Sequence, residues 1–456
     1  MKASQKWSWV ALILLVSLAL SSCTELGVNQ YKAEGEGTLP GLKEPVTVVR
    51  DEKGMAYIYA RSPEDAMVAY GFTTAQDRLF QMELTRLFAA GRISEMIGEK
   101  GEALDTRMRT IGFHRHARRH AAILEPGTKY LLQKYLDGIN AFLQNHPGEY
   151  PLEFKLAGIR PKPWDLADSL TVLYLMSWDS AANIETEIIA QMLIEKVGLE
   201  KAREIFPLNI NPDEERKGKV SYPVPSSEMA RLNLASDKHL RAFLEDRPLQ
   251  FGSNNWVTGP RLSAGGKPIV SNDPHLDARV LPGPWYPCGL ITPEFRWVGA
   301  GIPGLPAMVI GRNGHIAVGV TNAYGDAQDL YVETIDPQNP DRYLEGDQSL
   351  PFEVITEKLS IKDKNSPGGK REKEIKVQLT RRGPVVSGAL PGLKTDKVIT
   401  LRWAPFETPG PFLGADRIMM AKSAEEVRHA LSRFDIMMLN FVFADRDGNI
   451  GWIASG

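Results

Sequence analysis

The spacing of apolar residues predicts helices in the first half of the chain and strands in the second. Residues 45–59 alternate apolar and polar side chains around the turn Asp51-Glu52-Lys53-Gly54, which predicts a β-hairpin. From Ser62 the apolar residues recur with the helical period, after a Pro-Glu-Asp sequence typical of a capped helix start, and we expect this helix to continue to Glu95. Residues 127–146 and 165–199 also have helical periodicity.

After residue 253 the pattern becomes strand, turn, strand. Turn signals recur at Gly259-Pro260, Gly265-Gly266, Pro282-Gly283-Pro284 and Asn313-Gly314. The charged segment 363–373 is interpreted as the tip of a hairpin. Helices that come first and strands that come later favour an α+β layered fold.

The composition is that of an ordinary globular protein. The chain has 456 residues, of which 43% are hydrophobic and 24% charged, and its formal net charge is −2. This length is ample for a sizeable core. A near-neutral charge without a long basic stripe gives no reason to expect a nucleic-acid partner.

The front end has the pattern of an export signal. Lys2 and Lys6 precede an apolar stretch over Val10–Leu20, and Leu20-Ser21-Ser22-Cys23 resembles a bacterial lipobox. The alternatives are an ordinary secretory signal and a membrane span, for which the apolar run is short. We interpret 1–22 as a lipoprotein signal peptide, Cys23 as the lipidated residue and 23–40 as a tether. The protein is then expected on the periplasmic side of a membrane or at the cell surface, and its lipid anchor is its only membrane attachment.

Several residues that could carry chemistry are interpreted as structural. With Cys23 lipidated, Cys288 has no intrachain partner, so we expect no disulfide and a small buried side chain. His114, His116 and His120 could suggest a metal site, but Arg115, Arg118 and Arg119 surround them. Like-charged neighbours oppose cation binding, so an exposed basic helix face is predicted instead.

The sequence Gly252-Ser253-Asn254-Asn255-Trp256 suits a peptide bond that is built to break. Cleavage would give Ser253 an α-amino group, whose reference pKa of roughly 7.7–8.0 lets it act as a base for its own hydroxyl. Gly252 has no Cβ and tolerates the strained backbone that an N-to-O acyl shift needs. The alternative is a Gly-Ser turn before a strand.

Motifs in one fixed order support the cleavable bond. The run from Gly252 to Val257 looks like the processing site of the penicillin acylase (penicillin amidase) family of N-terminal-nucleophile hydrolases. Other segments that resemble this family are Arg50–Ile58, Ala75–Leu84, Gly91–Glu95, Asn272–Leu276, Gly311–Gly314 and Ala444–Gly451. The resemblance covers nearly everything from residue 41 to the end of the sequence.

The resemblance implies an αββα four-layer sandwich in which Ser253 opens the innermost strand. Residues 41–206 would form the α-chain region and 253–456 the β-chain region, joined as a self-derived heterodimer after cleavage. Residues 207–252 would be a spacer, with a surface loop containing one short helix over Lys238–Glu245 as the alternative. In relatives the β-chain runs far past the position of residue 456, so the β-chain region is expected to be incomplete.

The family also implies roles for individual residues. Ser253 would be nucleophile and base, and the backbone N–H of Asn322 would be the first oxyanion donor; the second donor, an Asn side chain, is expected beyond residue 456. His275 would contact and orient the serine, or else be a loop histidine satisfied locally. Asn255 is expected to shape the strand and orient Ser253. Met176 and Trp178 would line the acyl pocket, or else belong to the core.

A structural calcium ion is implied by a second set of residues. Asp326, the Gln328 carbonyl and Asp329 resemble a calcium-binding stretch, and Glu187 is the expected partner from the first half, with Glu185 as the alternative. A solvated acidic turn is the other interpretation. One ion per molecule is expected, with no organic cofactor.

The predicted function is hydrolysis of a linear amide between an apolar acyl group and an amine. A β-lactam side chain or an acyl-homoserine lactone would be such a small-molecule substrate, and the sequence does not choose between them. A Ser-His-Asp hydrolase has little support because Gly-x-Ser-x-Gly and Ser-x-x-Lys motifs are missing from the sequence. The alternative function is a surface lipoprotein that has lost catalysis and acts as a binding or scaffold module.

Overall fold

The fold is described from a computed structural model that covers residues 34–181, 183–205, 252–275, 282–390, 393, 395–407 and 409–456. The predicted signal peptide, Cys23 and the predicted spacer, apart from Gly252, lie outside these residues. Within the described residues, no helix has both the length and the apolar composition that crossing a bilayer requires.

The first half of the chain is helical apart from one hairpin. The hairpin consists of β1 (Thr47–Arg50) and β2 (Ala56–Tyr59), as predicted. The helical elements that follow are α2 (Pro63–Ala89), α3 (Ser94–Ile97), η1 (Gly98–Gly101), α4 (Glu102–Ile111), α5 (Phe113–Ile123), α6 (Pro126–Asn145), α7 (Leu152–Ala157), α8 (Leu166–Ala181), α9 (Ile184–Val197) and α10 (Leu199–Ile205).

Helix α2 begins where the sequence predicted. The hydroxyl of Ser62 accepts a hydrogen bond from the Asp65 N–H at 3.2 Å, and proline occupies the first helical position. Helices α2 and α6 cross at a glycine on each side. A Cβ on Gly71 would lie 1.9 Å from the Tyr135 carbonyl oxygen, and one on Gly138 would lie 1.8 Å from that of Val68. Only glycines at both positions therefore allow this backbone-to-backbone contact.

Eight strands form the central sheet, in the order β1-β2-β5-β6-β7-β8-β16-β17. The additional strands are β5 (Tyr286–Ile291), β6 (Arg296–Gly301), β7 (Ile310–Arg312), β8 (Ile316–Asn322), β16 (Leu439–Asp445) and β17 (Ile450–Ser455). The N-terminal hairpin joins this sheet through the parallel pairing of β2 with β5. Arg50 reinforces the junction with helix α2 through a 2.8 Å ion pair to Asp77, which also accepts a hydrogen bond from the Tyr286 hydroxyl.

Helices cover one face of the central sheet. The cross-strand neighbours Cys288, Gly299, Gly311, Val318, Phe443 and Gly451 share this face. Tyr70 of α2 stacks on Tyr286 at one end, and Phe434, which follows α15 (Ala424–Leu431), packs against Phe441 at the other. Cys288 is fully buried here, as predicted, and burial raises the pKa of its thiol to about 12.

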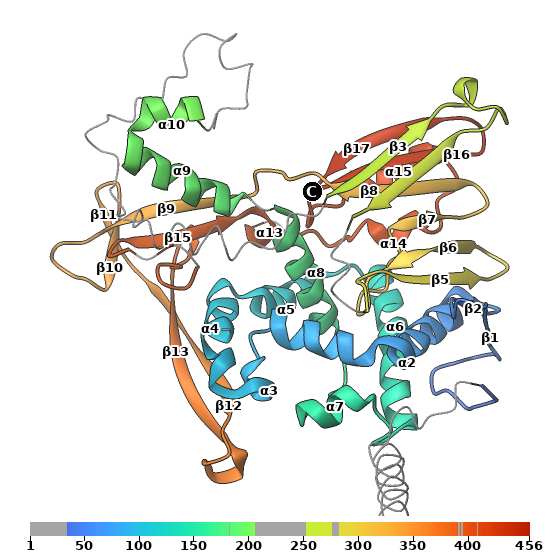
Figure 1. Ribbon diagram of the computed structural model, residues 1–456, viewed down its shortest axis with the longest axis horizontal. Helices are drawn as coiled ribbons and strands as arrows, with labels where there is room; N and C mark the ends of the chain where they lie inside the picture. The colour runs from blue at the N-terminus through green and yellow to red at the C-terminus, as the bar shows by residue number, and fades with distance from the viewer. Residues whose placement is uncertain are drawn as a thin grey trace, which may run out of the picture.

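The opposite face carries a two-stranded sheet of β3 (Ser253–Thr258) and β4 (Ile269–Pro274), with η2 (Pro260–Leu262) between them. Figure 1 shows this hairpin lying over β8 and β16. Helices, central sheet and small sheet therefore follow one another as layers. The predicted α+β class, with a helical first half, is confirmed.

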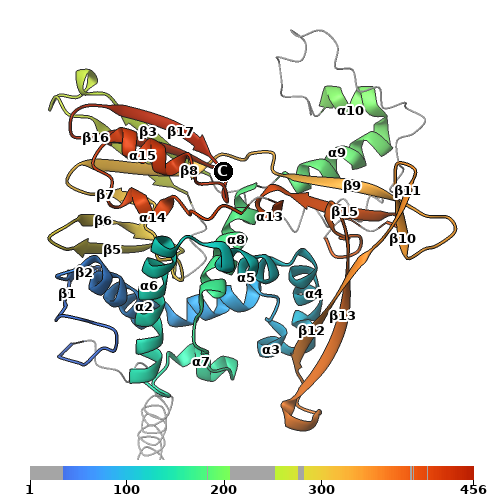
Figure 2. The ribbon, with the colours of Figure 1, turned by 180° about the vertical axis from the view of Figure 1, so that it is seen from behind.

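Two smaller sheets extend from the layers. The order β11-β10-β9-β15 joins β9 (Gln328–Ile335), β10 (Arg342–Glu345), β11 (Gln348–Pro351) and β15 (Val398–Trp403). The other sheet contains β12 (Glu353–Lys362), β13 (Lys370–Thr380) and β14 (Gly383–Pro384), with η3 (Pro367–Gly369) at the tip of the β12–β13 hairpin, within the predicted 363–373. Both views show this long hairpin running past α3 and α4 (Figure 1, Figure 2). The remaining short helices are α13 (Ala404–Glu407) and α14 (Ala415–Ile418).

Two predicted helices are shorter than their periodicity indicated. The helix expected to reach Glu95 ends at Ala89, because Gly91 takes a left-handed φ of 64° and turns the chain into α3. The segment 165–199 forms α8 and α9, with a break around Asn183. The apolar period continues on both sides of this break, so the pattern alone did not indicate it.

Candidate active site

Ser253 is the first residue of β3 and lies directly opposite Pro274 of β4. Asn255, two residues on, anchors the strand to the central sheet. Its side-chain amide donates to the Asn440 carbonyl at 2.9 Å and to the Gly319 carbonyl at 3.3 Å. Asn255 therefore fixes the position of the strand, as the sequence predicted.

Asn272 has a similar role that the sequence analysis did not assign. Its amide donates to the Val320 carbonyl at 2.8 Å, and its side-chain oxygen accepts from the Val320 N–H at 3.0 Å. β7 pairs only with Ala317 and Val318 of β8, so it does not reach the backbone of Val320. The Asn272 side chain makes the two backbone hydrogen bonds there that a neighbouring strand would make. Its position in the Asn272–Leu276 motif was the available signal.

The backbone of His275 contacts the predicted cleavage site. Its N–H donates to the Gly252 carbonyl oxygen at 2.8 Å, which is the carbonyl of the Gly252–Ser253 peptide bond. The His275 imidazole is about half exposed, and its Nε2 lies 2.7 Å from a carboxylate oxygen of Asp273. In the uncleaved chain the imidazole is thus paired with Asp273.

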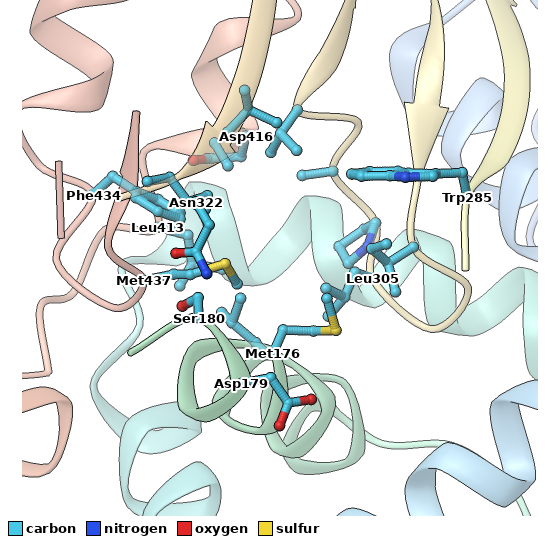
Figure 3. A pocket seen from close by; sticks show the side chains of 18 of the residues that line it. Met176, Asp179, Ser180, Trp285, Leu305, Asn322, Leu413, Asp416, Phe434 and Met437 are labelled. Atoms are coloured by element: carbon cyan, nitrogen blue, oxygen red, sulfur yellow. The ribbon is translucent and has the colours of Figure 1, made fainter. Parts of the chain in front are cut away.

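Ser253 and Gly252 line a cavity of about 640 Å³, together with Pro274 and Asn322. Most of the wall is apolar. It includes Met67, Leu131, Leu132, Leu173, Met176, Trp178, Phe295, Ile302, Leu305, Val309, Leu413, Met419, Met420, Phe434 and Met437. Figure 3 shows Met176, Leu305, Leu413, Phe434 and Met437 around the same space. These side chains come from both halves of the chain, so the cavity exists only when the two halves pack together.

The two residues proposed for an acyl pocket are both in this wall. Met176 and Trp178 lie near the C-terminal end of α8. The Trp178 ring also packs against Phe113 and Trp403 at centroid distances of 5.7 and 5.5 Å. Trp178 therefore belongs to the aromatic core on one side and to the cavity on the other.

Asn322 ends β8 at the edge of the cavity. Its carbonyl accepts a hydrogen bond from the Asn440 side chain at 3.3 Å, and its own side-chain oxygen accepts from the Tyr324 N–H at 3.2 Å. Tyr324 has a positive φ of 49°, a conformation that few residues other than glycine adopt. The backbone at this end of the strand is therefore held by side-chain amides.

The predicted metal ligands converge, although more than 130 residues separate their two segments. Glu187 of α9 has a carboxylate oxygen within 4.8 Å of those of Asp326 and Asp329. Burial, and then repulsion from Asp329 and Asp326, raises the pKa of Glu187 to about 8, although the Leu330 N–H donates to it at 2.9 Å. Three clustered carboxylates of this kind form a hard, anionic donor set that suits Ca²⁺.

The surroundings of this cluster decide between the two glutamates that the sequence offered as ligands. The Asn183 amide donates to a carboxylate oxygen of Asp326 at 2.6 Å and also to the Gln328 carbonyl. The Asn183 side-chain oxygen is buried without a hydrogen-bond partner among the described residues. Glu185, the alternative ligand, lies outside the cluster and lines the large cavity. Of the two glutamates, Glu187 is therefore the one that meets Asp326 and Asp329.

The predicted exposed basic face on α5 holds for Arg118 and Arg119, but it is wrong for His116 and His120. His120 is fully buried, with Nε2 2.8 Å from the Gly410 carbonyl and Nδ1 3.2 Å from the Tyr174 hydroxyl. His116 stacks on Phe406 at 3.6 Å, and burial lowers the pKa of its imidazole to about 3. The helix packs this face against α8 and the segment after β15, which leaves Arg118 and Arg119 as its exposed cations.

Comparison with known proteins places the chain in a family. Residues 45–456 match the sequence model of the family described as penicillin amidase. The chain belongs to the penicillin amidase family, as its motifs predicted.

Relatives with assigned names include acylases of two kinds. Acyl-homoserine lactone acylase QuiP of Pseudomonas aeruginosa is 31% identical over an alignment that covers 96% of this chain and 53% of that protein. Penicillin acylase 2 proenzyme of Pseudomonas sp. strain SE83 is also 31% identical, over 91% of this chain and 53% of its own length. Penicillin G acylase of Escherichia coli is 25% identical, over 92% and 55%. The chain thus spans about half the length of the curated relatives it matches.

Among solved structures, a thermostable penicillin G acylase from Alcaligenes faecalis aligns with a TM-score of 0.37 and 22% identity. The alignment covers 44% of this chain and 35% of that one.

Proposed function

We propose that the protein is an amidohydrolase that cleaves its own Gly252–Ser253 bond and then uses Ser253 as an N-terminal nucleophile. Its substrate would be a linear amide between an apolar acyl group and an amine. The observation that carries this proposal is the position of Ser253 on the wall of a large apolar cavity, at the start of the β3–β4 hairpin, which the Asn255 and Asn272 amides attach to the central sheet. Family membership supports it.

Self-cleavage would begin with attack of the Ser253 hydroxyl on the carbonyl carbon of Gly252. The C–N bond breaks as an ester forms, and the freed nitrogen becomes the α-amine of Ser253 once it has taken up a proton. Water then hydrolyses the ester. The His275 N–H, 2.8 Å from the Gly252 oxygen, is placed to stabilise the negative charge that develops on this oxygen. The main chain of His275 would thus act in processing whatever its imidazole does.

Substrate hydrolysis would reuse the same hydroxyl. The α-amine of Ser253, with a reference pKa of roughly 7.7–8.0, takes the hydroxyl proton as the oxygen attacks the acyl carbonyl. The amine half of the substrate leaves with a proton, and water releases the acyl group as an acid. We assign the Asn322 N–H as an oxyanion donor and His275 as the residue that orients the serine, a role that requires its imidazole to turn away from Asp273 once the new terminus forms.

The acyl group would occupy the apolar cavity. Five methionines are among its lining residues, and their flexible, polarizable side chains adapt to acyl groups of different shape. Met176 and Trp178 would contact the acyl group directly. Both a β-lactam side chain and the acyl group of a homoserine lactone satisfy this chemistry.

We assign Glu187, Asp326, Asp329 and the Gln328 carbonyl to a structural Ca²⁺ site. Bound Ca²⁺ would offset two of the three negative charges of the carboxylates and join the region before the cleavage site to the region after it. Export and lipid attachment at Cys23 complete the proposal and rest on the sequence pattern of residues 1–23.

Self-cleavage is tested by intact mass and N-terminal sequencing of the complete product of the gene. We expect two chains, one of which begins Ser-Asn-Asn-Trp, and a single uncut chain for Ser253→Ala. Ser263→Ala, in the turn between β3 and β4, is the matched control and should be cut normally. A single uncut chain in the unsubstituted protein would refute the proposal and favour a binding module.

A further inference from the structure

A second cavity, of about 400 Å³, lies between α4, α5 and β12. It shares none of its lining residues with the cavity at Ser253. Its charged lining residues are Arg109, Arg115, Arg118, Arg119 and Glu357. Nothing in the proposed acylase chemistry uses these arginines.

The cavity has a large excess of positive charge. Arg109 donates to one carboxylate oxygen of Glu357 at 2.8 Å, and Arg115 donates to the other at 2.9 Å. Arg118 and Arg119 are exposed and form no ion pair within the described part of the chain. Among the lining residues, four guanidinium groups face one carboxylate, an excess of three positive charges that the nearby Glu353 only partly offsets, in a protein whose overall charge is −2.

Helix α5 begins at this cavity with an unfavourable charge distribution. Its N-cap is Gly112, which supplies no capping side chain, and its first turn has no acidic residue. That turn instead contains His114 and Arg115, both of which line the cavity. Free backbone N–H groups and the helix dipole make a helix N-terminus positive, so basic residues there are destabilising unless an anion offsets them.

Several hydrogen bonds fix the Arg115 side chain in the first turn of α5. Its Nη1 also donates to the Arg109 carbonyl at 3.1 Å, and its Nη2 donates to the Thr110 carbonyl at 3.4 Å. The guanidinium lies so close to Gly112 that a Cβ there would be 2.2 Å from Nη2. Its Nε is buried without a partner among the described residues. Two fixed guanidinium groups, those of Arg109 and Arg115, and two free ones thus surround the same space.

We propose that this cavity binds a phosphate dianion, either free or as the terminal phosphate of an organic ester. Guanidinium forks match the oxygen geometry of phosphate and form charge-assisted hydrogen bonds to it. A dianion would neutralise most of the excess charge and satisfy the N-terminus of α5. The Glu357 ion pairs with Arg109 and Arg115 already join the region after Ser253 to the region before it, and they hold two of the arginines in place for the ligand. The inference does not depend on the proposed acylase activity.

The test is isothermal titration of the whole protein with sodium phosphate and with glycerol 3-phosphate, at constant ionic strength set by sodium chloride. The double variant Arg118→Gln/Arg119→Gln leaves both Glu357 ion pairs intact. We expect it to bind either probe at least tenfold more weakly than the unsubstituted protein. Arg61→Gln/Arg160→Gln removes two other exposed arginines and is the charge-matched control, which should bind normally.

The outcomes separate the sources of the ligand. Tighter binding of glycerol 3-phosphate identifies an organic ester, whereas equal or tighter binding of inorganic phosphate identifies the free ion. Equal weakening in the two double variants would show a general charge effect and overturn the site. Failure of both probes to bind the unsubstituted protein would also overturn it.

Discussion

Replacing Glu187 with glutamine tests whether three carboxylates are held together by a cation. Glutamine keeps an oxygen that can accept from the Leu330 N–H, now at 2.9 Å, so the change removes the charge and preserves this hydrogen bond. Without a cation, the folded protein must keep Glu187, Asp326 and Asp329 within 4.8 Å of one another. Their repulsion should therefore depend on pH.

The sign follows from the pKa of Glu187, which rises from its usual value near 4.5 to about 8 in the folded protein. Between these values the folded state keeps a proton that the unfolded state has lost, so the free energy of unfolding falls as pH rises through this window. Each tenfold change in proton affinity corresponds to about 1.4 kcal/mol, which gives an upper limit of roughly 5 kcal/mol. Screening at this partly exposed carboxylate reduces the expected loss to ~2–3 kcal/mol.

The assay is urea unfolding between pH 5 and pH 8.5, in chelator and in calcium chloride. In chelator we expect the unsubstituted protein to lose ~2–3 kcal/mol across this range, and calcium to abolish most of the loss because a bound cation favours the ionised carboxylates. Glu187→Gln should show a flatter pH profile and little response to calcium. Glu185→Gln, two residues away and outside the cluster, should behave like the unsubstituted protein. Identical pH profiles for the protein and Glu187→Gln would refute the reasoning.

Three further substitutions test the hydrogen bonds of Asn272 and two contacts that hold the helical region together. Asn272→Leu removes both hydrogen bonds to Val320, and we expect mass spectrometry to show at least a tenfold slower self-cleavage; unchanged processing would exclude a positioning role. Arg86→Met leaves two buried carboxylates without their cation and should lower the free energy of unfolding in urea by about 3–5 kcal/mol, a result that a loss below about 1 kcal/mol would contradict. Gly71→Ala forces α2 away from a carbonyl of α6 and should lower the free energy of unfolding by about 1–3 kcal/mol, measured in urea. Gly265→Ala is the control and should not, because its Cβ would meet only the Ser263 hydroxyl, at an ordinary contact distance of 3.9 Å.

Local signals predicted the elements that local interactions form. Ser62 and the proline after it marked the start of α2, because a cap and a fixed φ act on neighbouring residues only. The alternation over 45–59 predicted the first hairpin for the same reason. The break between α8 and α9 was missed, since helical periodicity continues on both sides of it.

Burial of polar residues could not be predicted in this way. The arginines beside His116 and His120 indicated an exposed face, yet both rings pack inward against Phe406 and Tyr174. Phe406 is about 290 residues from His116 in the sequence, and Tyr174 is about 50 residues from His120. The sequence shows which side chains lie on one face of a helix. Whether these side chains are exposed depends on the segments that pack against that face.

The sequence by itself determined the family and the α+β class, and it predicted a cleavable bond at Ser253 and the residue types of a calcium site. Motifs in one order and local propensities are properties of the chain alone. Only the tertiary structure decided that Glu187 rather than Glu185 meets Asp326 and Asp329, and that the Asn272 amide pairs with Val320. It also decided that side chains from both halves enclose one cavity at Ser253. The physical reason is that these arrangements depend on contacts between distant segments, which form only when the helices and sheets pack.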